Sequence, residues 1–301
     1  MSWTLNDMPA LHGQTAVVTG ANTGLGLATS TELARRGAEV WLACRSLDKG
    51  RAAAAAIRRE VSDARVEPCV LDLVDLQSVQ ALACRLLEHL DHLDILVNNA
   101  GVVNLEQLQR SADGRELHMA TNHLGHFALT GRLLPLLRTA PAARVVTVSS
   151  GAYRNGTIDF DDLDWTRRPY HRVRAYADSK LANLLFMVEL QARFEAVGLD
   201  ARSVASHPGL AATPRQQSIG IGGVLARWLA APIITGALPQ LRAATDPTVP
   251  GGTYWGPRFG IRGGPVQLDL PLDTVSSKAA RRLWGVSEEL TGVRFGQSAM
   301  S

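Results

Sequence analysis

The sequence predicts an α/β protein in which helices cover both faces of a doubly wound parallel sheet, giving three layers, α/β/α. Short runs rich in Val, Leu and Ala alternate with longer helical runs from the N-terminus to about residue 206. The short runs are too apolar to leave one face in water, which is typical of parallel strands covered on both sides. A glycine-rich turn separates the first short run from the first helical run.

Each strand is expected where a short apolar run stands between two helical runs. The first, at 15–19, reads Thr-Ala-Val-Val-Thr, and the second, at 39–43, reads Glu-Val-Trp-Leu-Ala. Further strands are expected at 66–71, 93–97, 144–148 and 200–205.

Helices are expected between these strands. The run 25–36 stops before Gly37, which can close a helix, and the run at about 49–61 is rich in alanine. In 75–90, leucine and valine recur at helical spacing and form one apolar face. Two longer helices are expected at about 117–137 and at 174–197.

Composition and charge are those of an ordinary globular protein. Hydrophobic residues make up 46% and charged residues 20% of the 301 residues, and the net charge is +3. We expect no nucleic-acid partner, because neither a broad basic face nor a binding motif is present. The basic run 167–174 is interpreted as a solvated loop leading into a helix, with a docking patch as the alternative.

The sequence predicts a cytoplasmic protein without a transmembrane segment. The N-terminus has neither a basic start nor an apolar run, so it is not a signal peptide. The apolar stretch 224–238 is broken by Arg227 and Pro232 and is too short to span a bilayer.

The cysteines and a pair of histidines do not predict a metal site. Cys44, Cys69 and Cys84 are odd in number and lack metal-ligand spacing, so we expect buried thiols in a reducing compartment. His123 and His126 lie about one helical turn apart, but no third ligand of suitable spacing accompanies them. We interpret them as structural histidines and predict no metal.

The turn after the first strand predicts a Rossmann-type dinucleotide site. Gly20, Gly24 and Gly26 have the spacing Gly-x-x-x-Gly-x-Gly. Glycines there let a pyrophosphate approach the backbone at a helix N-terminus, where negative charge is favoured. A glycine turn with only a structural role is the alternative.

The end of the second strand favours NADP(H) over NAD(H). An enzyme specific for NAD commonly carries a carboxylate there for the ribose 2′-hydroxyl. This chain has Cys44 followed by Arg45, whose guanidinium suits a 2′-phosphate. The alternative is that Arg45 is an ordinary surface charge.

A tyrosine and a lysine are paired at helical spacing. Among four tyrosines only Tyr176 has a lysine four positions later, Lys180, and the chain contains only three lysines. On a helix this spacing places both side chains on one face. A surface pair without a function is the alternative.

Several motifs in this order resemble the short-chain dehydrogenase/reductase family, and within it the retinol-dehydrogenase-like branch. They span residues 15 to 213. The motifs are Thr19-Gly20-Ala21-Asn22-Thr23-Gly24-Leu25-Gly26, Asn98-Asn99-Ala100-Gly101, Thr121-Asn122-His123-Leu124-Gly125-His126-Phe127, Val148-Ser149-Ser150, Tyr176-Ala177-Asp178-Ser179-Lys180 and His207-Pro208-Gly209.

The resemblance implies roles at the chemical end of the site. Tyr176 would exchange the proton of the alcohol or carbonyl oxygen as general acid and base. Lys180 would bind the nicotinamide ribose and lower the pKa of the tyrosine. Ser150, rather than its neighbour Ser149, would hold the substrate oxygen, and Asn122 would position a water next to Lys180.

The resemblance also implies the cofactor contacts. They are the turn residues Gly20, Asn22, Thr23, Gly24, Leu25 and Gly26, then Arg45, then Asp72 with Leu73 at the adenine, Asn99, Ala100 and Gly101 along the channel, Tyr176 and Lys180, and Pro208, Gly209 and Thr213 at the carboxamide. One departure is the gap of 26 residues between Ser150 and Tyr176, about twice that of shorter members. The wall of the substrate pocket is therefore the part least defined by the resemblance.

We expect one domain over 1–301, with a cofactor half at about 13–150 and a substrate-side lobe at about 207–301, where the alternation fails. The apolar segment 219–234 is expected to close over a lipophilic alcohol, aldehyde or ketone; packing of the core or of a homo-oligomer is the alternative. The predicted function is an NADP(H)-dependent oxidoreductase. Two alternatives are a C=C reductase of the protochlorophyllide-reductase type, which relies on an added cysteine, and a non-catalytic NADP(H) sensor.

Overall fold

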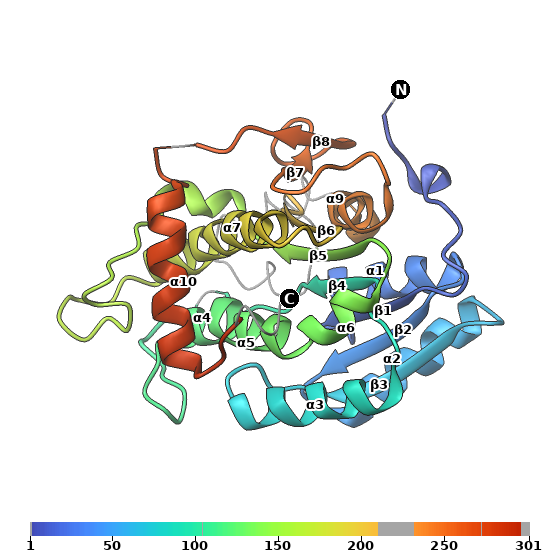
Figure 1. Ribbon diagram of the computed structural model, residues 1–301, viewed down its shortest axis with the longest axis horizontal. Coiled ribbons are helices and arrows are strands. Elements are labelled where there is room, and N and C mark those ends of the chain that lie inside the picture. Colours follow the sequence, from blue (N-terminus) through green and yellow to red (C-terminus); the bar gives the residue numbers. More distant parts are fainter. Residues whose placement is uncertain (1, 104, 210–231, 272, 296–301) are drawn as a thin grey trace.

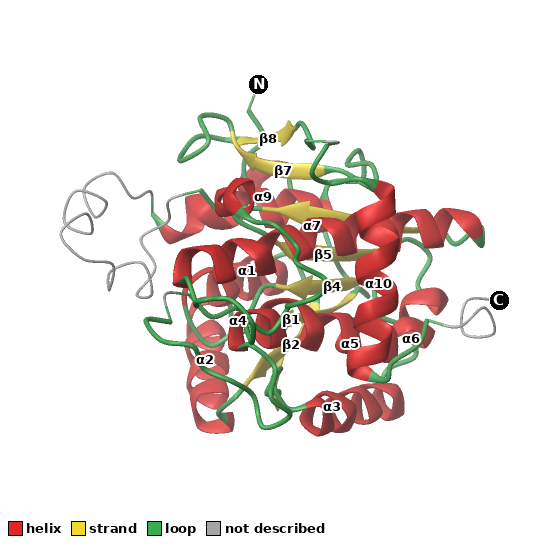
Figure 2. Cartoon of the chain, turned by 90° about the vertical axis from the view of Figure 1, so that its left-hand side faces the viewer, coloured by secondary structure: helices red, strands yellow, loops and turns green. Residues whose placement is uncertain are grey.

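The computed structural model describes residues 2–103, 105–209, 232–271 and 273–295. Within these residues the chain forms one eight-stranded sheet in the order β3-β2-β1-β4-β5-β6-β7-β8. All neighbouring strands are parallel except β7 and β8, which are antiparallel. Figure 2 shows the strands stacked from β2 near the bottom to β8 at the top. The predicted doubly wound parallel sheet is confirmed.

The six predicted strands are all present, with ends shifted by at most two residues. They are β1 (Thr15–Thr19), β2 (Glu39–Cys44), β3 (Arg65–Val70), β4 (Ile95–Asn98), β5 (Ala143–Val148) and β6 (Ala201–Ser206). Every residue of β1, β4 and β5 is buried, as the apolar runs predict for strands covered on both faces.

Helices cover both faces of the sheet (Figure 1). The helices α1 (Gly24–Arg35), α2 (Leu47–Glu60) and α9 (Ile233–Thr245) pack on one face, and α3 (Leu76–His89), α5 (Gly125–Arg132) and α7 (Arg172–Ala196) pack on the other. In β1, Val17 belongs to the core under α3, α5 and α7, whereas Ala16 and Val18 belong to the core under α1, α2 and α9. Because successive side chains of β1 point to opposite faces of the sheet, this one strand contributes to both apolar cores.

The prediction of one continuous helix at about 117–137 was wrong, because this segment is divided into shorter helices. The segment forms α4 (Leu117–Met119), a π-helical turn η2 (Ala120–Leu124), α5, and α6 (Leu134–Thr139). Pro135 lies in the first turn of α6 and cannot donate a backbone hydrogen bond, which explains the break at Leu133. The π-helical turn carries Asn122, and such turns are often found at functional sites.

We expected the alternation of strands and helices to fail after about residue 206, but it continues. Helix α9 is followed by β7 (Tyr254–Pro257), which extends the sheet beside β6, and β8 (Pro265–Leu268) closes its edge. Helix α10 (Ser277–Thr291) lies across α7, as Figure 1 shows. The C-terminal residues that the structure describes therefore add to the sheet and to its helical layer.

A third apolar cluster holds the other side of α7 in place. It includes Leu184 of α7, Leu283 of α10, Tyr254 of β7, and Tyr153 of the short 3₁₀ helix η3 (Gly151–Asn155). Because α7 packs against strands on one side and against this cluster on the other, its register relative to the end of β5 is closely defined.

Two smaller observations complete the fold. Cys44 and Cys69 are buried as predicted, but Cys84 is exposed on α3, so the prediction for that thiol was wrong. Of the helices in the described part of the chain, none is both long enough and apolar enough to cross a bilayer.

Candidate active site

Two adjoining pockets form one cleft at the carboxyl edge of the sheet. The first contains Tyr176 and Lys180, the second contains Arg45 and Asp72, and their cavity volumes are about 160 and 260 Å³. Residues that border both are Gly20, Thr23, Ala100 and Gly101. The cleft lies outside the carboxyl ends of the strands, near the reversal of strand order at β1 and β4, where sheets of this class bind ligands.

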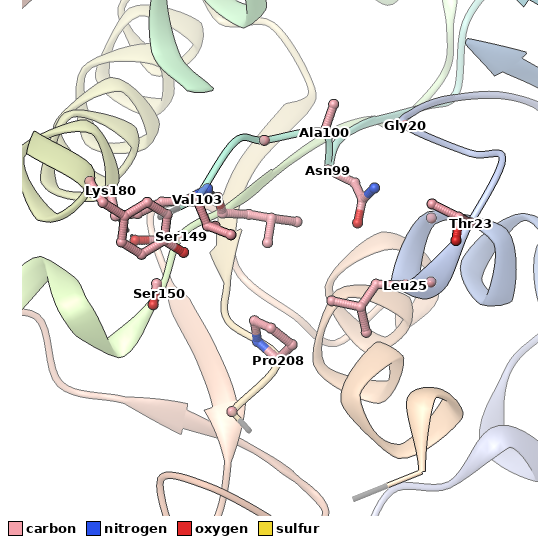
Figure 3. Close-up of a pocket in the computed structure, with 16 residues that line it drawn as sticks. Gly20, Thr23, Leu25, Asn99, Ala100, Val103, Ser149, Ser150, Lys180 and Pro208 are labelled. Atoms are coloured by element: carbon pink, nitrogen blue, oxygen red, sulfur yellow. Dashed lines mark hydrogen bonds between the residues drawn. The ribbon is translucent and has the colours of Figure 1, made fainter. Parts of the chain in front are cut away.

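The two sides of the first pocket come from segments that lie far apart in the sequence. Figure 3 shows Thr23 and Leu25 on one side and Ser149, Ser150 and Lys180 on the other. The elements concerned are the turn after β1 and the start of α1 on one side, and the end of β5 with α7 on the other.

The glycine-rich turn has the backbone that the sequence predicts. Gly20 and Gly24 have φ of +68° and +57°, a region that favours glycine. A Cβ at Gly26 would lie 2.4 Å from the Gly20 carbonyl oxygen, so a side chain there would push the turn apart. The turn therefore keeps bare backbone at the N-terminus of α1, which fits a pyrophosphate. Asn22 borders the second pocket.

Thr19 joins the turn to the end of β4. Its Oγ1 accepts hydrogen bonds from the backbone N–H groups of Asn99 and Ala100, both at 2.9 Å. The Asn99 side chain donates to the Thr19 carbonyl oxygen at 2.8 Å. His126 Nε2 lies 2.9 Å from the same Thr19 hydroxyl. These contacts fix the Asn99–Gly101 segment as a wall of the cleft.

Two cations border the second pocket at the end of β2. Arg45 and Lys49 are exposed, and neither forms an ion pair with a residue that the structure describes. Ser46 caps α2 by accepting a hydrogen bond from the Lys49 backbone, and this places Lys49 in the first turn beside the pocket. A 2′-phosphate fits this charge. Lys49 was missed by the sequence reasoning, although its position after a Ser cap was a usable signal.

The other wall of that pocket is formed by Asp72 and Leu73. The Asp72 carboxylate accepts a hydrogen bond from the Val74 backbone at 3.2 Å, and the Asp72 backbone donates to Ser78 at 2.9 Å. Both bonds stiffen the loop after β3, which is expected to face the adenine. The backbone of this loop packs directly against Gly125 at the start of α5.

Tyr176 lies in the first pocket together with Ser150 and Lys180. Burial raises the pKa of the Tyr176 phenol, and a hydrogen bond with Ser150 lowers it in part. Lys180 Nζ lies 5.8 Å from the centre of the Tyr176 ring and donates to the Val148 carbonyl oxygen at 3.0 Å. In the protein alone the pKa of the Tyr176 phenol is therefore raised, because burial is the largest cause, and not lowered as the resemblance implied.

Ser149 and Ser150 point in different directions. The Ser149 hydroxyl is buried and donates to the Lys180 carbonyl oxygen at 2.7 Å, so it anchors α7 to the end of β5. Ser150 instead meets the Tyr176 phenol. Of the two serines, Ser150 is therefore the one that contacts the Tyr176 hydroxyl, and its role toward the substrate oxygen stays a prediction.

Asn122 connects three segments around the pocket. Its Oδ1 accepts from the Val102 backbone at 2.8 Å, and its Nδ2 donates to the Val102 carbonyl oxygen at 3.1 Å and to Ser179 at 2.9 Å. Asn122 Oδ1 and Lys180 Nζ both border Gly101, where a Cβ would lie 3.0 and 3.5 Å from them. Asn122 is thus beside Lys180, while its amide also has a structural function.

The remaining predicted residues lie partly outside the described part of the chain. Pro208 and Gly209 line the first pocket, and Gly209 has φ of +68°; a Cβ there would lie 2.5 Å from the Ile261 carbonyl oxygen. Thr213 and residues 219–231 of the expected lid lie outside the described residues. Val103 lines the first pocket and was missed by the sequence reasoning.

The paired histidines have hydrogen-bonding partners within the protein. His123 Nε2 lies 2.8 Å from the Ser287 hydroxyl, and His126 Nδ1 lies 3.0 Å from the Asn122 carbonyl oxygen. Burial lowers the pKa of His123 to about 3 and that of His126 to about 4, so both are neutral at pH 7. Nowhere in the described residues do three or more His, Cys, Asp or Glu side chains form a group suited to a metal ion.

The long segment between Ser150 and Tyr176 is tied to α7 through Arg168. Its guanidinium lies 3.8 Å from the centre of the Trp165 ring and 3.5 Å from the carboxylates of Asp162 and Asp178. Arg168, near the start of the basic run, is therefore paired with carboxylates of this chain and is not available to a partner.

Comparisons with known proteins agree with this geometry. The family model described as short chain dehydrogenase matches residues 14–221. Human retinol dehydrogenase 13 is 37% identical over 294 residues, covering 94% of this chain and 86% of the relative. Human retinol dehydrogenase 12 is 39% identical over 290 residues, covering 95% and 88%.

Solved structures share the fold. An uncharacterized protein from Mycobacterium paratuberculosis has a TM-score of 0.83 at 41% identity, covering 98% of this chain and 100% of that chain. A short chain dehydrogenase from Escherichia coli CFT073 complexed with NADPH has a TM-score of 0.67 at 26% identity, covering 82% and 97%.

Proposed function

Because this chain belongs to the short-chain dehydrogenase family, whose members are oxidoreductases, we propose that it transfers a hydride between NADP(H) and a lipophilic alcohol, aldehyde or ketone, with Tyr176 as general acid and base. The observation that carries the proposal is the convergence of Tyr176, Ser150 and Lys180 on one pocket with the glycine-rich turn. That pocket joins a proton-transfer group to a backbone cradle that suits a pyrophosphate.

In the reductive direction Tyr176 donates its phenolic proton to the carbonyl oxygen, which Ser150 holds by a hydrogen bond. The bound nicotinamide supplies the hydride and, once oxidised, carries a positive charge. Burial raises the pKa of Tyr176 in the protein alone, which keeps the phenol protonated and ready to donate. The C–H bond of the product forms at the carbonyl carbon, and its O–H bond takes the Tyr176 proton.

In the oxidative direction Tyr176 must accept the proton of the alcohol as a phenolate. The Lys180 ammonium, 5.8 Å from the Tyr176 ring centre, is a positive charge of the right sign to favour the phenolate. A tyrosine that works as a base near neutral pH has a pKa roughly 3 units below its usual 10, about 4 kcal/mol. Burial acts against that change, so Lys180 and the oxidised nicotinamide must outweigh it.

The preference for NADP(H) is supported by charge. Arg45 and Lys49 are exposed cations at the end of β2, and no carboxylate stands where one would bind a ribose 2′-hydroxyl. A guanidinium binds phosphate through paired hydrogen bonds, and a second cation adds to the attraction.

The lipophilic substrate is supported by the apolar lining and by the relatives. Leu25, Val103, Val148 and Pro208 line the first pocket. Human retinol dehydrogenases 13 and 12 are 37% and 39% identical to this chain. Apolar surface removed from water contributes about 25 cal/mol per Å², which favours a long hydrocarbon chain over a sugar.

The two alternatives are less well supported. A C=C reductase that relies on an added cysteine is disfavoured, because Cys44, Cys69 and Cys84 are absent from the residues that line the Tyr176 pocket. A non-catalytic sensor is disfavoured because Tyr176 and Lys180 are both present in the cleft.

A substrate panel tests the proposal. We expect kcat/KM with NADPH to be higher for a ten-carbon aldehyde than for a three-carbon aldehyde, and a free sugar to be the poorest substrate. Reduction is followed by loss of the reduced-nicotinamide absorbance, with NADH as the parallel cofactor. Equal rates for all three substrates would contradict a lipophilic pocket, and absence of turnover with any carbonyl compound would favour the sensor.

A further inference from the structure

A buried carboxylate–imidazole pair lies next to the proposed active site. Glu116 Oε1 is 2.8 Å from His118 Nδ1, and these side chains are 1% and 0% exposed. The other carboxylate oxygen of Glu116 accepts a hydrogen bond from the Met119 backbone at 2.8 Å. Since both oxygens of the carboxylate are engaged, the imidazole is held in one orientation at the start of α4.

The His118 ring is in contact with the Tyr176 ring. Their centres are 5.9 Å apart, and the planes meet at 65° in an edge-to-face arrangement. The two rings come from α4 and α7, which pack against each other. The plane of the Tyr176 phenol is therefore supported from outside its own helix.

Packing alone does not account for a histidine at this position. His118 Nε2 is buried and has no hydrogen-bonding partner among the residues that the structure describes. A buried polar nitrogen without a partner lowers stability, whereas a phenylalanine would fill similar space without that cost. What the histidine adds is Nδ1, which ties the ring to Glu116.

We propose that His118, held by Glu116, is a positioning residue for Tyr176. It fixes the plane of the phenol so that the hydroxyl meets the substrate oxygen. His118 is not among the residues that line the two pockets, so it acts through Tyr176 and not by touching substrate or cofactor. The inference rests on the proposed function of Tyr176.

The test compares variants of the pair in the full-length protein with NADPH and the ten-carbon aldehyde. His118→Ala is expected to lower kcat by roughly 10- to 100-fold, because a misplacement of about 1 Å can cost about a hundredfold. The Kd for NADPH is expected to stay within about twofold of the wild-type value, since binding does not use His118. The isotope effect with deuterated NADPH is expected to rise, because hydride transfer becomes slower.

Glu116 provides the rescue experiment. Glu116→Ala removes the hydrogen bond to the His118 imidazole and is expected to lower kcat as His118→Ala does. In Glu116→Gln the amide oxygen can accept from the Met119 backbone while the amide N–H donates to Nδ1 of the His118 tautomer that carries its proton on Nε2. The ring then stays in place, and kcat should return to within about threefold of wild type. Tyr170→Phe is the matched control, because it removes a hydroxyl 3.4 Å from His118 Nδ1 and keeps the Trp165 ring contact. It should leave kcat unchanged.

Three results would overturn the inference: His118→Ala with wild-type kcat, NADPH affinity falling in proportion to kcat, or Glu116→Gln no better than Glu116→Ala. If His118→Ala does not fold, His118→Phe decides, since it keeps a ring but cannot bond Glu116; wild-type kcat in that variant would also overturn the inference.

Tyr176→Phe is measured in parallel. If it retains turnover, the proposed function fails; if it is inactive while the His118 variants are normal, only this inference fails.

Discussion

At the scale of single residues, one exposed guanidinium is expected to distinguish the two nicotinamide cofactors. Arg45 borders the second pocket and is not committed to an ion pair with any described residue. Arg45→Ala should weaken NADPH binding on the order of 1.5–3 kcal/mol, roughly ten- to a hundredfold, and leave NADH binding almost unchanged. Titration of both cofactors against wild type and variant measures this.

Arg51→Ala is the matched control for that prediction. Arg51 is an exposed arginine of α2 that faces Asp48 at 3.6 Å and is not among the residues lining the pocket. It should bind both cofactors as wild type does. Equal affinity of wild type for NADH and NADPH would show that Arg45 does not select the cofactor.

The candidate site residues that spacing alone indicates are those whose relation is local, whereas Ser150, Asn122, Asp72 and Asn99 were predicted from the resemblance to the family. Tyr176 and Lys180 are four positions apart on one helix, and the three glycines lie within one turn, so spacing alone reveals them. Lys49 and Val103 were missed because their places at the cleft depend on where whole loops lie. The raised pKa of Tyr176 was missed for a similar reason: burial is a property of the fold.

At the scale of elements, the close approach of α5 to the loop after β3 depends on Gly125. A Cβ there would lie 2.2 Å from the Leu73 carbonyl oxygen. Because this is a contact with backbone, Gly125→Ala should force α5 outward and lower the free energy of unfolding by about 1–3 kcal/mol. Denaturant unfolding of the purified variant and of wild type measures this difference in the free energy of unfolding.

Gly285 provides the matched control on another helix. It lies in α10, and a Cβ there would meet no atom within 4 Å. Gly285→Ala should raise the free energy of unfolding by about 0.5–1 kcal/mol, since alanine favours the helix and restricts the unfolded chain. Equal effects of the two substitutions would contradict the close packing of α5.

The elements that sequence patterns failed to predict have identifiable causes. The break between α5 and α6 follows from Pro135, a signal that was present but outweighed by the apolar pattern around it. Strand β7 has only four residues, two of them Gly and Pro, so no strand pattern was visible. It forms because its backbone pairs with β6, a contact between residues about 50 positions apart.

At the scale of the whole molecule, buried histidines should make the fold sensitive to acid. Burial lowers the pKa of His123 to about 3 and those of His126 and His207 to about 4, against 6.5 when exposed. Below about pH 6.5 the unfolded chain therefore binds protons that the folded chain excludes, and stability falls as pH falls.

One carboxyl group acts in the opposite direction. Burial raises the pKa of Asp178 from 3.8 to about 6, so its contribution to stability is greatest at low pH and is lost as pH rises through about 6. Together the four groups should give a net loss of about 2–3 kcal/mol per pH unit near pH 5. Denaturant unfolding between about pH 7 and 4.5 measures the change in the free energy of unfolding. Constant stability over that range would show that the three histidines take up protons in the folded protein.

The proposed hydride transfer requires Tyr176 as the proton donor and acceptor. Tyr176→Phe removes the exchangeable proton and keeps the ring, so NADPH should bind with unchanged affinity. The direct measurement is single-turnover transfer of deuterium from deuterated NADPH to the carbonyl carbon of the ten-carbon aldehyde. We predict one deuterium in the wild-type product and a rate 10²–10⁴-fold lower in Tyr176→Phe, the usual contribution of general acid–base catalysis. Transfer by the Phe variant at half the wild-type rate would exclude Tyr176 as the general acid and base.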